Sequence, residues 1–214
     1  MHYRAIGGAK KVKEIKTRYS TGSFEIVKRG VKAPLREWEK LPDCLRTEIQ
    51  LGDESYITAQ HGEVSWTEDA SGKIDIEDSP EHKARLQIRT RLNRLEHLDR
   101  QSSFFCLAHC GTQLVDSSEC HCVRITIPGT RDTLLHYYGT EDFLLYRTDQ
   151  NYTDEQSTIL YADYRAVDGI LHPFRYQVTY HQYGVSYLYT LDSIATNIDL
   201  DGICYDPPEL IPYR

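Results

Sequence analysis

The chain has 214 residues, of which 40% are hydrophobic and 27% charged, proportions that are ordinary for a globular protein with one sizeable core. Its 25 basic and 32 acidic residues give a net charge of −7. This balance argues against a general nucleic-acid binder, which needs a basic face to neutralise phosphates. No apolar run is long enough to cross a bilayer, so we expect any membrane contact to be peripheral.

The opening stretch, MHYRAIGGAKKVKEIKT, turns polar almost at once and lacks the pattern of a signal peptide. Two interpretations stay open: a cytosolic protein, or a mature segment of an exported protein whose signal is absent from this sequence. The Gly7-Gly8 pair predicts a break between two short helices. Their apolar residues recur at a spacing of three, at Ile6, Ala9, Val12 and Ile15.

Most of the remaining chain alternates between apolar and polar residues with the period of a β-strand. Short spacings punctuated by Gly, Pro and Asp predict hairpins in residues 19–30, 32–41, 44–52, 54–62 and 63–69. Further strands are predicted at 112–117, 120–127, 132–139, 143–150, 157–167, 170–182 and 186–197. Between strands 157–167 and 170–182, the Asp168-Gly169 pair supplies a tight turn.

One strong amphipathic helix is predicted over residues 79–100. Ser79 is a good N-cap, and Pro80 suits the first turn. Arg91 falls, by helical angle, within an apolar stripe that consists of Ile88, Leu92, Leu95 and Leu98.

These elements predict a single α+β domain, residues 1–214, built on one large antiparallel sheet. Two helical regions are too few to cover a flat sheet of this width, and long sheets curl because strands twist. We therefore expect a curved sheet, an incomplete β-barrel, with helices covering the concave face. Such a shape leaves an apolar hollow, which is a binding site by default.

Residues 161–194, YADYRAVDGILHPFRYQVTYHQYGVSYLYTLDSI, combine an Asp-Gly turn with a Pro-Phe-Arg strand. With these features the stretch resembles the LolA/LolB-like family of envelope lipoprotein carriers and their outer membrane lipoprotein-sorting relatives. Other stretches that resemble the family follow in the expected order, at 5–26, 61–69, 118–127, 132–147 and 197–209. The chain departs from the family at His172, at Ile203-Cys204 and in the Cys- and His-rich region 102–122.

The resemblance implies an incomplete β-barrel closed by helices, in a periplasmic or cell-envelope carrier that holds acyl chains without a cofactor. The implied partners are a lipid or an acylated protein, together with an envelope transporter. Helix 79–100 is the candidate cover, and Arg91 is the candidate contact for an anionic or carbonyl-rich head group. The candidate ligand-binding residues are Trp38, Trp66, Ile88, Arg91, Leu92, Leu95, Phe143 and Phe174. For the apolar and aromatic residues the alternative is packing in the core. For Arg91 it is a snorkelling side chain or a pair with a structural carboxylate.

A cluster of soft metal ligands lies between residues 106 and 122: Cys106, His109, Cys110, Cys120, His121 and Cys122. A zinc site needs four ligands that converge, but the cluster has no Cys-x-x-Cys pair. On a strand, Cys120 and Cys122 share one face while His121 points away. We expect no metal site here. A disulfide is an alternative in an exported protein, and half-buried free thiols are favoured.

Motifs for enzymatic chemistry are absent from the sequence. It has no Gly-x-Ser-x-Gly elbow, no His-Glu-x-x-His helix and no Gly-rich phosphate loop. We therefore expect no enzyme. Two rivals to a lipid carrier stay open: a non-enzymatic structural or interaction module with a filled core, and a metal-binding or hydrolytic protein that uses the 106–122 cluster.

Overall fold

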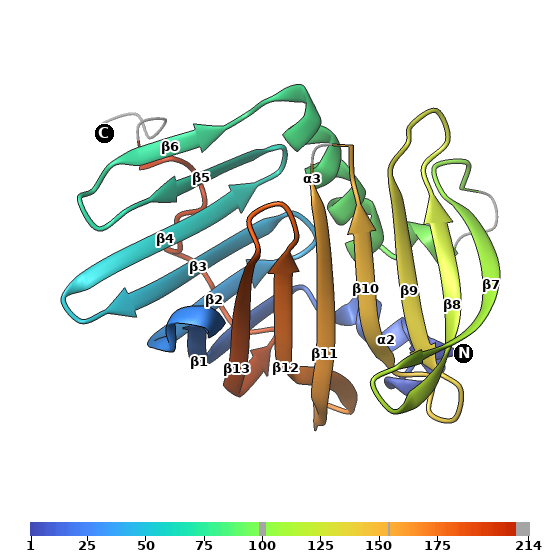
Figure 1. The fold of residues 1–214 in the computed structure, drawn as a ribbon. Coiled ribbons are helices and arrows are strands. Elements are labelled where there is room, and N and C mark those ends of the chain that lie inside the picture. The colour runs from blue at the N-terminus through green and yellow to red at the C-terminus, as the bar shows by residue number, and fades with distance from the viewer. Residues whose placement is uncertain (99–101, 154, 209–214) are drawn as a thin grey trace. The chain divides into compact units, whose positions relative to one another are not determined.

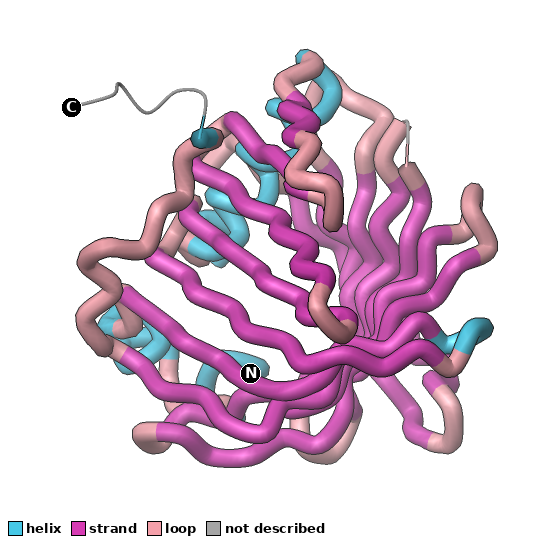
Figure 2. Tube along the Cα trace, turned by 90° about the vertical axis from the view of Figure 1, so that its left-hand side faces the viewer, coloured by secondary structure: helices cyan, strands magenta, loops and turns pink. Residues whose placement is uncertain are grey.

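The computed structural model of the chain describes residues 1–98, 102–153 and 155–208 (Figure 1). Strands dominate it, as Figure 2 shows. Its helices are α1 His2–Ala5, α2 Ala9–Glu14 and α3 Pro80–Asn93, with 3-10 turns at η1 Val27–Arg29 and η2 Glu96–Leu98. Its strands are β1 Thr17–Ile26, β2 Val31–Lys40, β3 Cys44–Leu51, β4 Glu54–His61, β5 Val64–Glu68, β6 Ile74–Glu77, β7 Cys106–Val115, β8 Ser118–Thr126, β9 Thr133–Gly139, β10 Leu145–Asn151, β11 Gln156–Val167, β12 Ile170–Tyr180 and β13 Val185–Thr196.

The described strands form one sheet, in the order β6-β5-β4-β3-β2-β1-β13-β12-β11-β10-β9-β8-β7. The ladders from β2 to β6 and from β7 to β13 are antiparallel. Within the described residues β6 and β7 end the order without pairing to each other, so the sheet is open. This confirms the predicted α+β class and the large antiparallel sheet, which does not close. Helices on a concave face stay a prediction.

Residue contacts divide the chain into two compact units. Unit 1 comprises Met1–Glu14, Glu25–Val31 and Leu95–Thr190, and unit 2 comprises Ile15–Phe24, Lys32–Arg94 and Leu191–Arg214. The single domain expected over residues 1–214 stays a prediction. In the part of the chain that the structure describes, no helix has the length and apolar character needed to span a membrane.

In unit 1, the Gly7-Gly8 break between α1 and α2 lies against the Asp168-Gly169 turn. Gly7 has a φ of +122°, which favours glycine, and a Cβ at this position would overlap the carbonyl oxygen of Gly169. Beside this contact the backbone N–H of Leu171 donates to the carbonyl oxygen of Ile6 at 2.9 Å. The Gly7-Gly8 break and the Asp168-Gly169 turn, which are far apart in the sequence, thus hold the start of the chain against the start of β12.

In unit 2, α3 begins where the sequence predicts it. The Ser79 side chain accepts a hydrogen bond from the backbone N–H of His82 at 3.3 Å, which caps the first turn. The His82 ring in turn shares a 2.6 Å hydrogen bond with the Ser65 hydroxyl on β5. Leu86 and Ile88 are the buried residues of this helix. These contacts hold α3 against the sheet of its own unit.

The predicted helix 79–100 is longer than the observed one. α3 ends at Asn93, and Leu95 has a φ of +60°, a left-handed conformation that an α-helix does not contain. Leu95 and Leu98 therefore lie outside the α-helix, although their spacing continues its period. Residues 99 and 100 of the predicted helix lie outside the described residues.

Two strand predictions also need correction. β6 was not predicted, because its four residues, IDIE, are too short to establish an alternation. β7 begins at Cys106 rather than at residue 112. Its register shifts between His109 and Thr112, and such a bulge interrupts the period of two on which the prediction depended.

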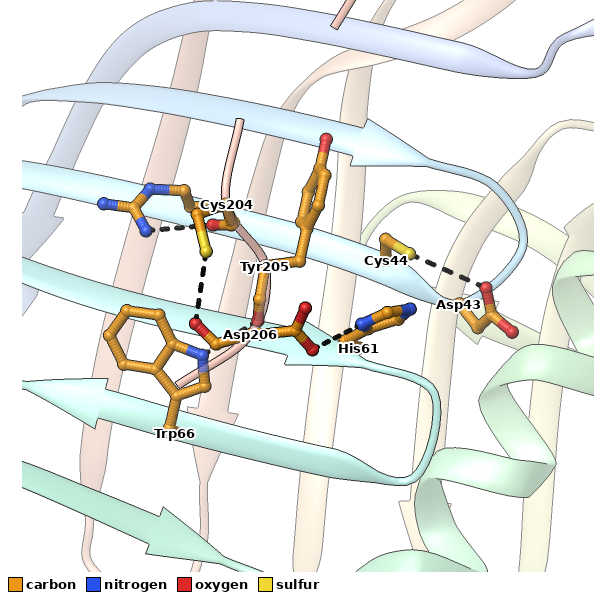
Figure 3. Close-up of polar contacts among 8 residues, drawn as sticks. Asp43, Cys44, His61, Trp66, Cys204, Tyr205 and Asp206 are labelled. Carbon is orange, nitrogen blue, oxygen red and sulfur yellow. Dashed lines mark hydrogen bonds and ion pairs between the residues drawn. The ribbon is translucent and has the colours of Figure 1, made fainter. Parts of the chain in front are cut away.

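The C-terminal segment of unit 2 crosses the face of the sheet that carries Trp66 (Figure 3). The Trp66 indole N–H donates to the carbonyl oxygen of Tyr205 at 2.9 Å, and Arg46 donates to that of Cys204 at 3.1 Å. Arg46 and Trp66 share this face, because each pairs with one residue of β4, Ala59. Ser65, next to Trp66, points to the other face, so α3 and the C-terminal segment cover opposite faces of β5.

We expect Trp66→Phe to lower the free energy of unfolding by about 1–3 kcal/mol, because the buried Tyr205 carbonyl loses its donor. Urea denaturation measures the change. The matched control is Trp38→Phe, because Trp38 is half-buried on the same face. This substitution should lower the free energy of unfolding by less. Equal losses in the two variants would contradict a specific role for the indole hydrogen bond.

Candidate functional site

Unit 1 contains an apolar cavity of about 300 Å³ beside α1. Strands β7, β8 and β9 form one wall, and α1, the η2 turn and the β9–β10 loop contribute the rest. The lining residues are Met1, His2, Tyr3, His97, Leu107, His109, His121, Val123, Ile125, Tyr138 and Phe143. Most of this surface is apolar, and the lining side chains that carry polar groups are histidines and tyrosines.

The strand wall follows from register and alternation. Leu107 pairs with Ile125 and His109 with Val123, so side chains two residues apart on β7 and β8 share the cavity face. Tyr138 on β9 pairs with His121 and extends the same face. The alternation of side chains along β7, β8 and β9 therefore produces the strand wall of the cavity.

On the opposite side of the cavity, side chains of α1 bond to the β9–β10 loop and to the η2 turn. The His2 ring nitrogen Nδ1 contacts the carbonyl oxygen of Phe143 at 2.8 Å. The Tyr3 hydroxyl and His97 Nε2 share a hydrogen bond at 3.2 Å. Phe143, with a φ of +58°, stacks on the His121 ring with 6.2 Å between centroids. Four segments that are remote in the sequence meet at this cavity.

Buried histidines dominate the electrostatics. His97 is 8% exposed, and burial lowers its pKa to about 4. Burial likewise lowers the pKa of His136 to about 3. His136 pairs with Val123 on the cavity face of β9, although it is not among the lining residues, and it shares a 2.9 Å hydrogen bond with the Tyr138 hydroxyl. Burial also lowers the pKa of His2. These three rings are therefore neutral at pH 7, and an apolar ligand would meet uncharged imidazoles.

Two buried imidazole nitrogens, Nδ1 of His97 and Nδ1 of His121, have no hydrogen-bond partner among the described residues. An imidazole nitrogen at this position can donate or accept one hydrogen bond, according to the tautomer. The lining thus combines hydrocarbon with a few polar groups, which suits a ligand with an apolar chain and a polar end. No carboxylate lines the cavity, and in the described ranges no group of His, Cys, Asp and Glu side chains is arranged to hold a metal ion.

A second hollow in unit 1, of about 540 Å³, has a different character. Asp116, Asp163 and Arg175 line it together with tyrosine, serine and leucine side chains. It is larger, but its charged groups are unsuited to a hydrocarbon chain. We therefore take the smaller cavity as the candidate site.

Of the residues predicted from the sequence, three lie in unit 1. Phe143 lines the cavity. Phe174 is buried beneath the guanidinium of Arg165, whose carbon lies 4.6 Å from the ring centroid. Leu95 is buried next to the η2 turn. Neither Phe174 nor Leu95 is among the lining residues.

The other five predicted residues lie in unit 2. Trp38 is half-buried with its ring 5.4 Å from that of Tyr19, and Trp66 is buried under the C-terminal segment. On α3, Ile88 is buried and Arg91 and Leu92 are half-buried. The two tryptophans share the face of the sheet that is opposite to the one on which α3 packs.

Sequence reasoning missed His2, Tyr3 and His97, which only tertiary structure brings together. His109 and His121 did attract attention, as part of the Cys/His cluster, and their rings lie 5.5 Å apart. Strand alternation predicts His121 on the face opposite to Cys120 and Cys122. The structure confirms this arrangement. His121 lines the cavity, and Cys120 and Cys122 both belong to a separate buried cluster.

No protein-family model matches the chain, and no curated protein matches it. Solved structures do match. A DUF1329 family protein from Desulfovibrio piger has a TM-score of 0.60 at 14% identity, covering 93% of each chain. An outer membrane lipoprotein-sorting protein domain from Vibrio parahaemolyticus has a TM-score of 0.56 at 10% identity, covering 90% of this chain and 91% of the other.

A LolA superfamily protein from Nitrosomonas europaea has a TM-score of 0.56 at 11% identity and covers 98% of this chain and 100% of its own. At such identities the likeness is one of fold. The resemblance predicted from the sequence is confirmed at that level: the chain has the fold of the LolA-like proteins.

Proposed function

We propose that the protein binds the acyl chain of a lipid or of an acylated protein, and that the cavity of unit 1 is the binding site. The observation that carries this proposal is the predominantly apolar lining, which has no carboxylate and in which burial lowers the pKa of His2 and His97. Binding is by burial, without covalent chemistry, so the protein is a carrier rather than an enzyme.

The size of the cavity narrows the ligand class. Its volume of about 300 Å³ lies at the lower end of the range of small-molecule sites, ~300–1,000 Å³. This volume suits one chain, or part of one, rather than several chains at once. Each buried CH₂ contributes about 0.8 kcal/mol, so a chain binds firmly with few specific contacts.

The names of two structures with this fold support the proposed binding of an acyl chain. One is a lipoprotein-sorting domain, and the other is a LolA superfamily protein. By analogy we propose a periplasmic or cell-envelope location, peripheral to the membrane, with an envelope transporter as a further partner. Roles in the same carrier for Trp38, Trp66 and the α3 residues, including head-group contact by Arg91 and gating by the helix, stay predictions.

An interaction module with a filled core is the second candidate. It is favoured by apolar side chains on β7, the terminal strand of the order, where Leu107 is 49% and Leu114 is 74% exposed. Exposed apolar edges commonly mark protein contacts. The two residues also separate the two candidates, because only Leu107 lines the cavity.

We expect Leu107→Asp to weaken binding of a fluorescent fatty acid by roughly tenfold to a hundredfold, because the chain loses an apolar contact and meets a carboxylate. Titration of the fatty acid against the intact protein measures the affinity. Leu114→Asp is the matched control on the same strand and should bind as the wild type does. Unchanged affinity in Leu107→Asp, or equal losses in both variants, would contradict the assignment of the cavity.

A further inference from the structure

Cys110 and Cys122 lie opposite each other in the β7–β8 hairpin of unit 1. The register shifts between His109 and Thr112, so Cys110 and Gly111 together oppose Cys122 across a β-bulge. Gly111 has a φ of +87°, a conformation for which the bulge needs glycine. The bulge thus places two cysteines on neighbouring strands at one level of the ladder.

Their side chains share one face. Cys110 packs against the buried cluster that contains Cys120, Cys122 and Tyr137. Cys122 is 1% exposed and Cys110 is half-buried, and both are free thiols in the structure. Opposite residues of an antiparallel pair have Cα atoms ~4.5–5.5 Å apart, inside the ~4.4–6.8 Å that disulfides span. The ladder can therefore accommodate a bond between them without a large backbone movement.

The other cysteines of the hairpin are less suited to a bond. Cys120 pairs with Gln113 and lies two residues from Cys122 on the same strand. Cys106 is exposed and pairs with Thr126. Register therefore selects one pair from the four cysteines of the 106–122 cluster.

We propose that Cys110 and Cys122 are a redox-sensitive pair that closes to a disulfide when the protein meets a small disulfide oxidant such as oxidised glutathione. The thiolate of Cys110, the more accessible of the two, attacks one sulfur of the oxidant, forms a mixed disulfide and releases one thiol. The thiolate of Cys122 then attacks the Cys110 sulfur, forms the Cys110–Cys122 bond and releases the second thiol. One oxidant disulfide is reduced, and the protons of the two protein thiols pass to the two thiols released.

The bond would fasten the terminal strand of the order to its one neighbour (Figure 1). The residues that flank the two cysteines include His109, His121 and Val123, which line the cavity on the other face. Oxidation would therefore hold this wall in place and slow the release of a bound chain. This last consequence rests on the proposed function, whereas the disulfide itself does not.

The test begins with the intact, reduced protein, incubated with oxidised and reduced glutathione at graded ratios and then acidified and alkylated. We expect thiol titration in denaturant to show the loss of two of the six free thiols, in addition to any that carry glutathione. Digestion with trypsin and a Glu-specific protease cuts after Glu119 and Arg124, which separates Cys110 from Cys122. A non-reduced digest should then contain a cross-linked peptide pair that has lost two hydrogen atoms.

Three variants decide which sulfurs are joined. Cys110→Ser should abolish the cross-link, and Cys106→Ser, on the same strand, should leave it unchanged. Cys120→Ser should also retain it, because Cys120 shares a proteolytic fragment with Cys122. A cross-link lost in Cys120→Ser would overturn the proposal. Alkylation of both Cys110 and Cys122 at ratios where the exposed Cys106 already carries glutathione would overturn it as well. The cross-link is read by mass, so a failure of lipid binding leaves this result intact.

Discussion

Gly7→Ala is expected to lower the free energy of unfolding by about 3 kcal/mol or more. At a φ of +122° an alanine is strained, and its Cβ would overlap the carbonyl oxygen of Gly169 on the turn before β12. Backbone on both sides must then move, which breaks the hydrogen bond from Leu171 to Ile6. Urea denaturation followed by circular dichroism measures the loss.

Gly8→Ala is the matched control for this substitution. Gly8 has a similar φ of +103°, but a Cβ there would meet no atom within 4 Å. Gly8→Ala should therefore lower the free energy of unfolding through backbone strain alone, by about 1–2 kcal/mol. If the two alanine variants were equally stable, the close approach of the Gly7-Gly8 break to the Asp168-Gly169 turn would be wrong.

Acidification is expected to destabilise the fold between about pH 6.5 and pH 4. The unfolded chain binds protons at its histidines below about pH 6.5, whereas burial holds the pKa of His97 at about 4 and that of His136 at about 3. Wherever the unfolded state binds more protons, stability rises as the pH rises and falls as the pH falls. At about pH 5, each of the two rings should lower the free energy of unfolding by about 2 kcal/mol relative to its value at about pH 8.

Urea denaturation at about pH 8 and about pH 5 measures this effect. His97→Gln should lose about half of the pH dependence attributed to the pair. The groups that face these rings are His2, Tyr3 and Tyr138, and none of them is acidic. His61→Gln, at a side chain that is 52% exposed, is the control and should retain the pH dependence. A wild-type stability that does not change between the two pH values would contradict the burial of the histidines.

Much of the fold was predictable because strands with one buried face carry a period of two. The hairpins from β2 to β5 and from β9 to β13 appear within a few residues of their predicted bounds. The failures have local causes. The chain turns at Leu95 while its apolar spacing continues, and the β7 bulge at Cys110-Gly111 interrupts the alternation.

The candidate site was less predictable, because its parts come from segments that no sequence period connects. Phe143 was identified as a lining residue from the aromatic pattern alone. His2, Tyr3 and His97 gave no signal, because their meeting depends on how α1 and the η2 turn pack on the strands. The cysteines and histidines of residues 106–122 looked like one cluster, but strand alternation sends them to opposite faces.

The central claim is that the cavity of unit 1 holds an acyl chain. Native mass spectrometry of the gently purified protein, followed by lipid extraction and by addition of palmitate, tests it most directly. We expect a bound mass that extracts as an acyl species or appears on addition of palmitate, and that is reduced in Leu107→Asp but not in Leu114→Asp. A clean mass of the bare chain that takes up no fatty acid would contradict the account and favour the interaction module.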